Sequence, residues 1–145
     1  MKSSSSRLLL HVKAALSLIG LAIAFYLVLS EPGPGQKIAF VCPGQSSSSS
    51  LINCSAVLTS RYSRILGVPL SVWAFSWFAV LFALVLFQRK NAMFGMLSAC
   101  FSITGVFAVL YSLLAMFSIG HVCVYCSAID AILVAVFAIG IIELS

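Results

Sequence analysis

The sequence predicts an all-α integral membrane protein, a bundle of four transmembrane helices with a short lateral helix after the first span. Apolar residues make up 62% of the 145 residues and charged residues only 8%, whereas a soluble globular domain carries about 25% charged residues. So few charges cannot cover a water-facing surface of this size. Four apolar stretches are long enough to cross a bilayer, which takes about 20 helical residues. We expect a single membrane domain over residues 1–145.

The four spans are expected at about residues 14–30, 69–87, 92–119 and 124–144. The first follows basic residues, as the apolar part of a signal peptide does. Its apolar part is long, however, and no convincing small-residue cleavage site precedes Glu31, so we expect it to remain as a span. The motif EPGPGQK then ends this helix, because proline and glycine interrupt helical structure.

Residues 31–68 form the only sizeable polar segment, and we expect them to make one loop outside the membrane. This outer loop contains Cys42, Cys54 and, between them, a low-complexity run of five serines at 46–50.

A short amphipathic lateral helix is predicted within this loop, from Asn53 to Arg64, with Asn53 or Ser55 capping its start. Four apolar side chains in and after this stretch are expected to face the membrane: Val57, Leu58, Ile65 and Leu66. The motif GVPL then interrupts the lateral helix, and Pro69 takes an early position in the second span.

The formal net charge of +5 does not indicate a nucleic-acid partner, because the basic residues flank apolar runs and form no stripe with interleaved aromatic residues. These basic residues are Lys2, Arg7, Lys13, Lys37, Arg61, Arg64, Arg89 and Lys90. One group precedes the first span and another separates the second span from the third, so the positive-inside rule places that face in the cytoplasm. The outer loop and the turn at His121 would then share the outer face, although the three basic residues of the loop weaken the contrast.

Five cysteines are present: Cys42, Cys54, Cys100, Cys123 and Cys126. The motif HVCVYC places Cys123 and Cys126 on one face at the start of the fourth span. The amides and dipole of a helix start stabilise a thiolate, which is the form that attacks disulfides or quinones; metal binding is the competing use of such a pair. Cys100 lies within the third span without a partner in sequence and is expected to be inert packing.

Cys42 and Cys54 form a second possible pair on the same outer side as Cys123 and Cys126. Thiol–disulfide exchange runs through mixed disulfides, so two pairs within reach can pass electrons in sequence. A pair in a water-exposed loop reaches a soluble protein, and a pair at the membrane boundary reaches a lipid-soluble oxidant. Disulfides persist in oxidising compartments, so we expect these cysteines to face one.

The segment CSAVLTSRYSRILGVPLSVWA, taken with HVCVYC, resembles the vitamin K epoxide reductase family, and its compact loop is most similar to the bacterial members. The family pattern is a cysteine pair after the first span, a serine six residues after the second cysteine, and Cys-X-X-Cys entering the fourth span. The matching positions are Cys42, Cys54, Ser60, Cys123 and Cys126. The resemblance covers the chain from position 42 to its end. It implies a four-helix bundle around a quinone of the ubiquinone, menaquinone or phylloquinone type.

The resemblance also implies roles for these residues. Cys126 would react with the quinone, and Cys123 would pair with Cys126 and exchange with Cys54. Cys42 and Cys54 would form the shuttle pair that a thioredoxin-like protein attacks, and Ser60 would lie near the quinone. No thioredoxin domain is fused to this chain, so that partner would be a separate protein.

The family implies a location and an activity as well. Bacterial members oxidise the thiols of secreted proteins, whereas animal members reduce vitamin K epoxide. The expected location is a bacterial inner membrane with the site facing the periplasm or exterior, or the endoplasmic reticulum membrane with the site facing the lumen in a eukaryote.

The chain departs from the family pattern in two places. Eleven residues separate Cys42 from Cys54, a longer gap than is usual, and Asp130 stands where animal members carry a tyrosine one turn after Cys126. Acidic residues within spans are costly and usually functional, so Asp130 is a candidate to take up a proton or orient the quinone. The alternative is a neutral carboxyl without a function. Asn53 is a further candidate for a hydrogen bond to the quinone, although its simpler role is the helix cap.

Three other functions fit parts of the pattern. A metal-handling membrane protein would use the cysteines as soft ligands, but the chain lacks a second Cys-X-X-Cys and methionine-rich motifs, and we expect no metal. A structural subunit would carry two inert disulfides. An unrelated family of disulfide-generating quinone reductases places its Cys-X-X-Cys in the first outer loop rather than at the fourth span.

Overall fold

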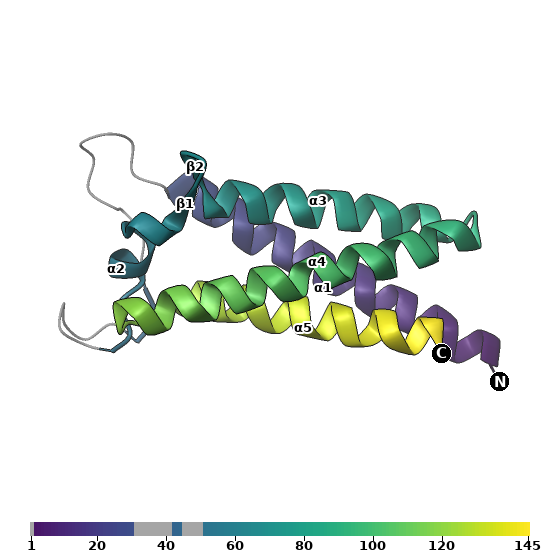
Figure 1. Ribbon diagram of the computed structural model, residues 1–145. Helices are drawn as coiled ribbons and strands as arrows, with labels where there is room; N and C mark the ends of the chain where they lie inside the picture. The colour runs from purple at the N-terminus through teal and green to yellow at the C-terminus, as the bar shows by residue number, and fades with distance from the viewer. Residues whose placement is uncertain (1, 31–41, 45–50) are drawn as a thin grey trace.

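Four long helices run side by side in the computed structural model, which describes residues 2–30, 42–44 and 51–145 (Figure 1). The helices are α1 (Lys2–Ser30), α3 (Leu70–Gln88), α4 (Ala92–Ile119) and α5 (Val124–Leu144). All four are long and apolar enough to cross a membrane, which confirms the predicted spans. The first is longer than expected, since the part of α1 suited to a bilayer begins at Ser5. The motif EPGPGQK and the serine run lie outside the described residues.

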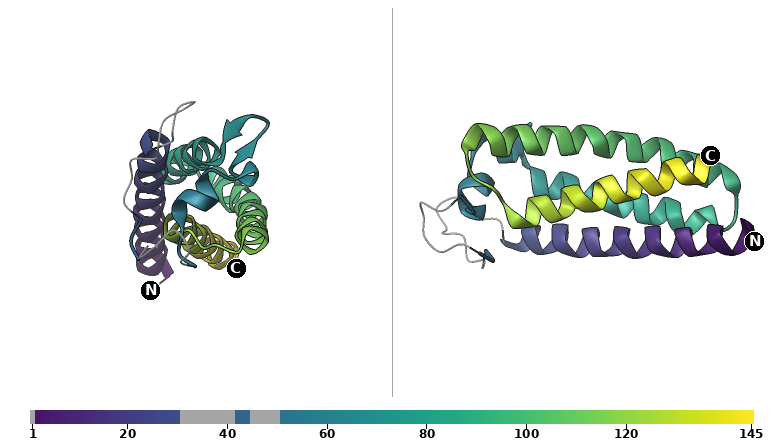
Figure 2. Two further views of the ribbon diagram at one scale, coloured as in Figure 1. Left: turned by 90° about the vertical axis from the view of Figure 1, so that its left-hand side faces the viewer. Right: turned by 90° about the horizontal axis from the view of Figure 1, so that it is seen from below.

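Each long helix packs against two others: α1 and α4 each contact both α3 and α5 (Figure 2). The core between them consists of apolar side chains such as Leu27, Phe78, Leu81 and Val136, none more than 3% exposed. Phe78 comes so close to α1 that a methyl group at Gly20 would overlap its ring.

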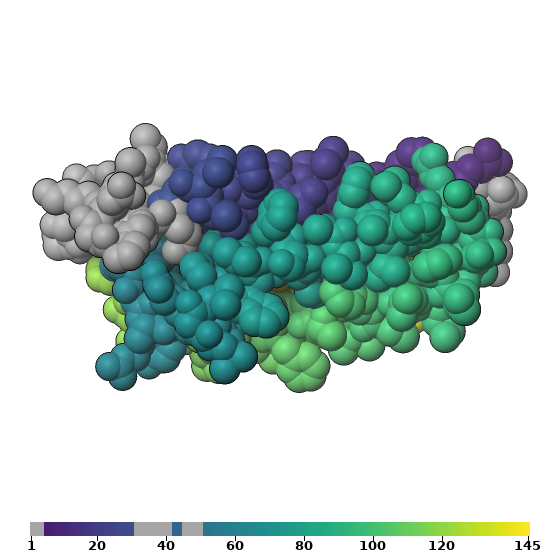
Figure 3. Space-filling model, turned by 90° about the horizontal axis from the view of Figure 1, so that it is seen from above, coloured from purple at the N-terminus to yellow at the C-terminus, as the bar shows by residue number. Residues whose placement is uncertain are grey.

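The outer surface of the bundle is apolar as well. Leu18 is 53% exposed, Phe117 89% and Ile142 56%. Side chains of α1, α3 and α4 cover one long face of the molecule, with residues 51–69 gathered at one end (Figure 3). A helical bundle that satisfies its backbone internally and exposes apolar side chains is suited to lipid.

Both chain termini and the α3–α4 turn lie at one end of the bundle, and the short elements lie at the other (Figure 1). These short elements are the helix α2 (Cys54–Leu58), a 3-10 turn at Arg61–Ser63, and the hairpin of β1 (Arg64–Ile65) and β2 (Val68–Pro69). At this same end Gly120 ends α4 in the left-handed conformation, with φ of 74°, and the chain turns directly into α5.

The predicted lateral helix from Asn53 to Arg64 is wrong in its extent, because α2 ends at Leu58. Two hydroxyl groups there bond to the backbone: Thr59 Oγ1 donates to Ser55 O at 2.6 Å and Ser60 Oγ donates to Val57 O at 2.7 Å. Such local side-chain bonds compete with helix propagation. The 3-10 turn and the hairpin replace the remaining helical turns.

The early end of α2 also separates the four apolar side chains that were expected to share a membrane-facing side. Val57 is 8% exposed and packs beside Cys54, whereas Leu66 at the hairpin tip is 90% exposed. Of the two residues predicted as possible caps, Asn53 and Ser55, Asn53 is the N-cap, since its Oδ1 accepts a hydrogen bond from Ala56 N at 3.1 Å. Pro69 directly precedes α3 as its N-cap.

Two hydrogen bonds tie the short elements to the bundle. Trp73 Nε1 on α3 donates to Ile65 O at 3.4 Å, and the Tyr111 hydroxyl on α4 donates to Tyr62 O at 3.0 Å. Residues 54–69 therefore form a roof over the end of the bundle, anchored on both sides of the gap between α3 and α4.

Lys13 differs from its predicted place among the charges that flank the spans. Its side chain is fully buried, and its Nζ lies 2.8 Å from Glu143 Oε2 on α5 and 2.9 Å from Ser98 Oγ on α4. Glu143 offers a buried ion-pair partner that hydropathy along the chain does not reveal, so this lysine lies inside the bundle.

Candidate redox site

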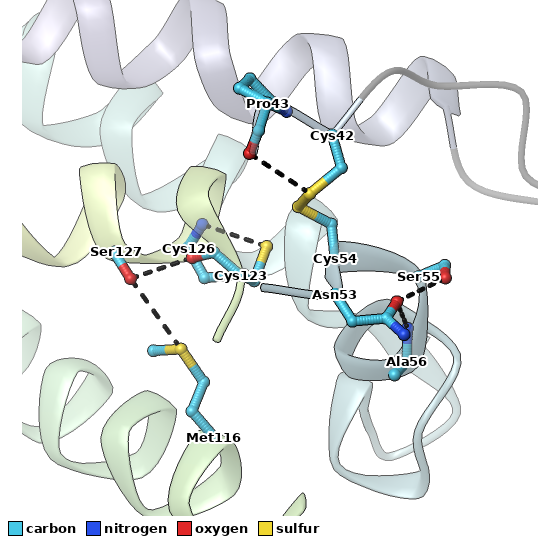
Figure 4. Close-up of a disulfide and its surroundings, with 10 residues drawn as sticks. All are labelled: Cys42, Pro43, Asn53, Cys54, Ser55, Ala56, Met116, Cys123, Cys126 and Ser127. Carbon is cyan, nitrogen blue, oxygen red and sulfur yellow. Dashed lines mark hydrogen bonds between the residues drawn. A yellow bond between two sulfur atoms is a disulfide. The ribbon is translucent and has the colours of Figure 1, made fainter. Parts of the chain in front are cut away.

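All four cysteines of the predicted pairs lie together at the end of the bundle that carries the short elements (Figure 4). Cys54 and Cys123 are both fully buried and belong to one packed cluster with Val57 and Met116. Cys42 and Cys126 are partly buried and pack against that cluster. The fold therefore brings the loop pair and the helix pair to one place.

A short parallel bridge between Ile52 and Val122 aligns the two cysteine-bearing segments. Asn53 N donates to Val122 O at 3.1 Å, and Val122 N donates to Leu51 O at 2.8 Å. Cys54 and Cys123 follow directly on these paired strands of backbone. No sequence pattern indicated this pairing, because the two segments are far apart along the chain.

Cys42 and Cys54 form a disulfide with a Cα–Cα distance of 5.9 Å, within the usual range for such bonds. Cys54 is the first residue of α2 and is fully buried, while Cys42 remains partly exposed. The sulfur of Cys42 is thus the more accessible of the two. The eleven residues between the cysteines do not prevent the pairing.

Cys123 and Cys126 are free thiols at the start of α5. Cys123 is the N-cap, and Cys126 N donates to Cys123 Sγ at 3.4 Å. The pKa of Cys123 is lowered from its usual value, first by the hydrogen bond from the Cys126 side chain and then by the backbone amides of Cys126 and Tyr125, which together outweigh the effect of burial. This arrangement favours a thiolate at Cys123, the reactive form of cysteine.

A cavity of about 690 Å³ lies beside the cysteine cluster, under the roof and between α3 and α4. Its volume falls within the range of about 300–1,000 Å³ that is typical of small-molecule sites. The walls are largely aromatic and aliphatic; Trp77 stacks on Phe101 with ring centroids 5.2 Å apart and donates to Thr104 Oγ1 at 2.8 Å. A flat, hydrophobic ring system fits walls of this kind.

The polar groups of the cavity wall include three of the predicted site residues, Cys126, Ser60 and Asp130. Cys123 and Asn53 are not among the described lining residues. Cys126 therefore faces the cavity while its neighbour Cys123 packs with Cys54. The structure places Asn53 at the cap of α2, and its contact with a quinone stays a prediction.

Asp130 occupies an unusual position for an acidic residue. It is 8% exposed, and its Oδ2 has no hydrogen-bond partner. A hydrogen bond from the Ser112 hydroxyl reaches the same carboxyl group. Ser112 was missed by sequence analysis, although small and apolar residues at helical spacing mark the buried face of α4: Ser98, Ser102, Gly105, Val109 and Ser112.

His121 and Cys100 are not among the described residues that line the cavity. His121 lines a smaller hollow of about 410 Å³ with Met116 and Ser127 at the end of α4. Cys100 is an exposed free cysteine on the outer surface of α4, and its inert role stays a prediction. No group of three His, Cys, Asp or Glu side chains arranged for a metal ion occurs in the described part of the chain.

Comparison with known proteins gives one family match. The model of the vitamin K epoxide reductase family matches residues 12–141, which include all four clustered cysteines and most of each span. No curated protein matches the chain.

Proposed function

Because the chain belongs to the vitamin K epoxide reductase family and is therefore a membrane redox enzyme, we propose that it oxidises a thioredoxin-like protein and reduces a lipid quinone. One observation carries this proposal. Cys126 lines the cavity and also packs against the buried cluster that contains both Cys123 and Cys54 of the Cys42–Cys54 disulfide. The helix pair thus contacts both a disulfide that a protein can reach and a hydrophobic chamber that a quinone can enter.

The first step is attack on the Cys42–Cys54 disulfide by a thiolate of the reduced partner protein. Cys42 is the proposed point of attack, because it is partly exposed while Cys54 is fully buried. A mixed disulfide with Cys42 then forms and the Cys54 thiolate is released inside the cluster. The second thiol of the partner resolves this mixed disulfide, so the partner leaves oxidised by two electrons.

In the second step the Cys54 thiolate attacks Cys123 of an oxidised Cys123–Cys126 pair, and Cys126 leaves as a thiolate. The shared cluster of Cys54 and Cys123 supports this choice of sulfur. Cys42 then attacks Cys54, which restores the outer disulfide and leaves Cys123 and Cys126 reduced. The structure has this distribution, with Cys42 bonded to Cys54 and the helix pair free.

In the third step Cys126 delivers two electrons into the cavity and the Cys123–Cys126 disulfide forms again. The quinone accepts these two electrons, together with two protons, and becomes a quinol. The aromatic walls would hold its ring, and Ser60, which lines the cavity, would turn its hydroxyl from Val57 O to donate to a quinone oxygen. Ubiquinone, menaquinone and phylloquinone types all fit this chemistry, and vitamin K epoxide is the substrate of animal members.

We further propose that the cysteine end faces the periplasm or exterior of a bacterium, or the lumen of the endoplasmic reticulum. Arg7, Arg89 and Lys90 lie on segments at the opposite end of the bundle, with both termini. The positive-inside rule favours the cytoplasm for that end.

The direct test uses purified protein with a reduced thioredoxin-like donor and either decylubiquinone or menadione, followed by quinone absorbance. The wild type and the matched control Cys100→Ala should turn over at the same rate, because Cys100 lies on the outer surface of α4. Cys126→Ala should lose quinone reduction entirely. A Cys126→Ala protein with normal turnover would rule this order of steps out.

A further inference from the structure

The acidic residue in the cavity wall is the strongest feature that these electron-transfer steps leave unused. Asp130 and Cys126 both line the cavity, and they lie one helical turn apart on α5. Asp130 is 8% exposed and its Oδ2 has no hydrogen-bond partner. By contrast, Glu143, the only other acidic residue in the described part of the chain, is bonded to Lys13 and Gln88.

The described residues of the cavity wall include no positive charge that would balance a carboxylate at Asp130. No lysine, arginine or histidine is found among the described residues that line the cavity. The titratable side chains that line the cavity with Asp130 are Cys126 on its own helix, Tyr62 on the roof and Tyr111 on α4. The described lining residues of α1 and α3 include no titratable group, and Cys123 interacts with the Asp130 carboxyl electrostatically. An unpaired carboxylate in such a setting is costly, whereas a neutral carboxyl is tolerated and carries a proton it can donate.

We propose that Asp130 donates a proton to a carbonyl oxygen of the quinone as Cys126 supplies the electrons, an inference that rests on the proposed function. The Ser112 hydroxyl donates a hydrogen bond to the carboxyl group, while Oδ2 is buried and has no hydrogen-bond partner in the protein. Ser112 is thus a positioning residue for this transfer.

Forming the Cys123–Cys126 disulfide from the Cys123 thiolate and the Cys126 thiol releases two electrons and one proton, whereas reduction of the quinone to the quinol consumes two electrons and two protons. Asp130 passes one proton to a carbonyl oxygen and regains the proton that Cys126 loses, so its own protonation is unchanged over a cycle. Water supplies the second proton of the quinol, which replaces the proton that Cys123 lost to water when it ionised. No further oxidant or co-reactant is required.

The test compares the wild type with Asp130→Asn, which keeps the shape and a hydrogen bond but has no proton to transfer, and with Asp130→Glu, which restores the proton. With decylubiquinone, kcat of Asp130→Asn should fall by about 10²-fold, the usual scale for losing a general acid. Its KM should change little, and Asp130→Glu should recover part of the kcat. Wild-type activity should also decline as pH rises and Asp130 loses its proton, and this decline should be absent from Asp130→Asn.

A second readout does not depend on turnover. Infrared difference spectra between the oxidised and reduced protein, taken without quinone, should show a protonated-carboxyl band that Asp130→Asn lacks and Ser112→Ala shifts. Disulfide exchange with the thiol donor alone reports whether each variant is folded.

The outcomes separate the two proposals. An Asp130→Asn protein that keeps the wild-type kcat, or wild-type spectra without a carboxyl band assignable to Asp130, overturns the proton-donor role while quinone reduction stands. A raised KM with unchanged kcat would likewise show a merely structural role. A wild-type protein that exchanges disulfides but reduces neither decylubiquinone nor menadione refutes the proposed function, and the role of Asp130 with it.

Discussion

The two ends of the bundle differ in whether their buried charged residues have bonding partners in the protein. At the end with the termini, Lys13 and Glu143 form an ion pair of 2.8 Å, Ser98 accepts from Lys13 at 2.9 Å, and Gln88 donates to Glu143 at 3.3 Å. These residues come from all four long helices. At the cysteine end, Asp130 keeps one oxygen without a partner beside a cavity.

The buried polar groups at the end with the termini hold the helices together, whereas Asp130 at the cysteine end is placed to take part in a reaction. A polar network buried at membrane depth holds helices together when its members satisfy one another. The carboxyl of Asp130 stabilises nothing comparable, and its unmet hydrogen bond is available to a ligand. The cysteine end is also assembled from short elements, each attached by only one or two of the hydrogen bonds described above, which suits sulfurs that must change partners.

The largest expected effect comes from disrupting the ion pair at the end with the termini. Glu143→Ala leaves Lys13 charged and buried without its carboxylate, so the free energy of unfolding should fall by about 3–5 kcal/mol. Thermal unfolding in detergent would measure this loss. The double variant Lys13→Met with Glu143→Leu removes both charges and should stay close to the wild type. Equal destabilisation by the double and single variants would contradict this account of the network.

The next effect concerns the bridge that aligns the cysteine segments. Val122→Pro removes the N–H that donates to Leu51 O, and displacing reacting groups by about 1 Å can cost 10²-fold in rate. In stopped-flow measurements with the thiol donor, the rate of electron transfer from the Cys42–Cys54 pair to the Cys123–Cys126 pair should fall by about 10²-fold. Val122→Ala keeps the N–H and serves as the matched control. An unaffected Val122→Pro rate would mean that the bridge does not align the pairs.

A smaller effect concerns the ionisation of Cys123. The pKa of Cys123 is lowered chiefly by the hydrogen bond from Cys126. Its thiolate should therefore persist at pH values below those at which cysteines usually ionise, and it should disappear only as pH falls through the lowered pKa. Ultraviolet thiolate absorbance in a Cys100→Ala background would follow this titration. Adding Cys126→Ala removes the hydrogen bond and should move the midpoint upward. A midpoint that does not rise would assign the lowering to the helix start alone.

The smallest effect is expected on the outer surface. Cys100 is an exposed cysteine on α4 without a bonding partner among the described cysteines. Cys100→Ala should leave both the unfolding midpoint and quinone turnover within error of the wild type. A clear loss of turnover would point to an unexpected role for this face of α4.

Much of the local structure could be predicted because its causes are local. Hydropathy and helix breakers placed three spans almost to the residue, and Asn53 was one of the two predicted caps of α2. The lateral helix was overextended because the hydroxyls of Thr59 and Ser60 bond to its own carbonyls, a competition that amphipathic spacing does not register.

The sequence by itself determined four lipid-facing spans and a dithiol at the start of the last one, because hydrophobic length and Cys-X-X-Cys spacing act over neighbouring residues. Only the tertiary structure decided that Ile52 pairs with Val122, that Cys126 lines a cavity with Asp130, and that Lys13 meets Glu143 across 130 positions. The way in which the helices pack around one core decides which residues become neighbours. In lipid, each buried polar group then bonds to the partner that this packing brings close to it.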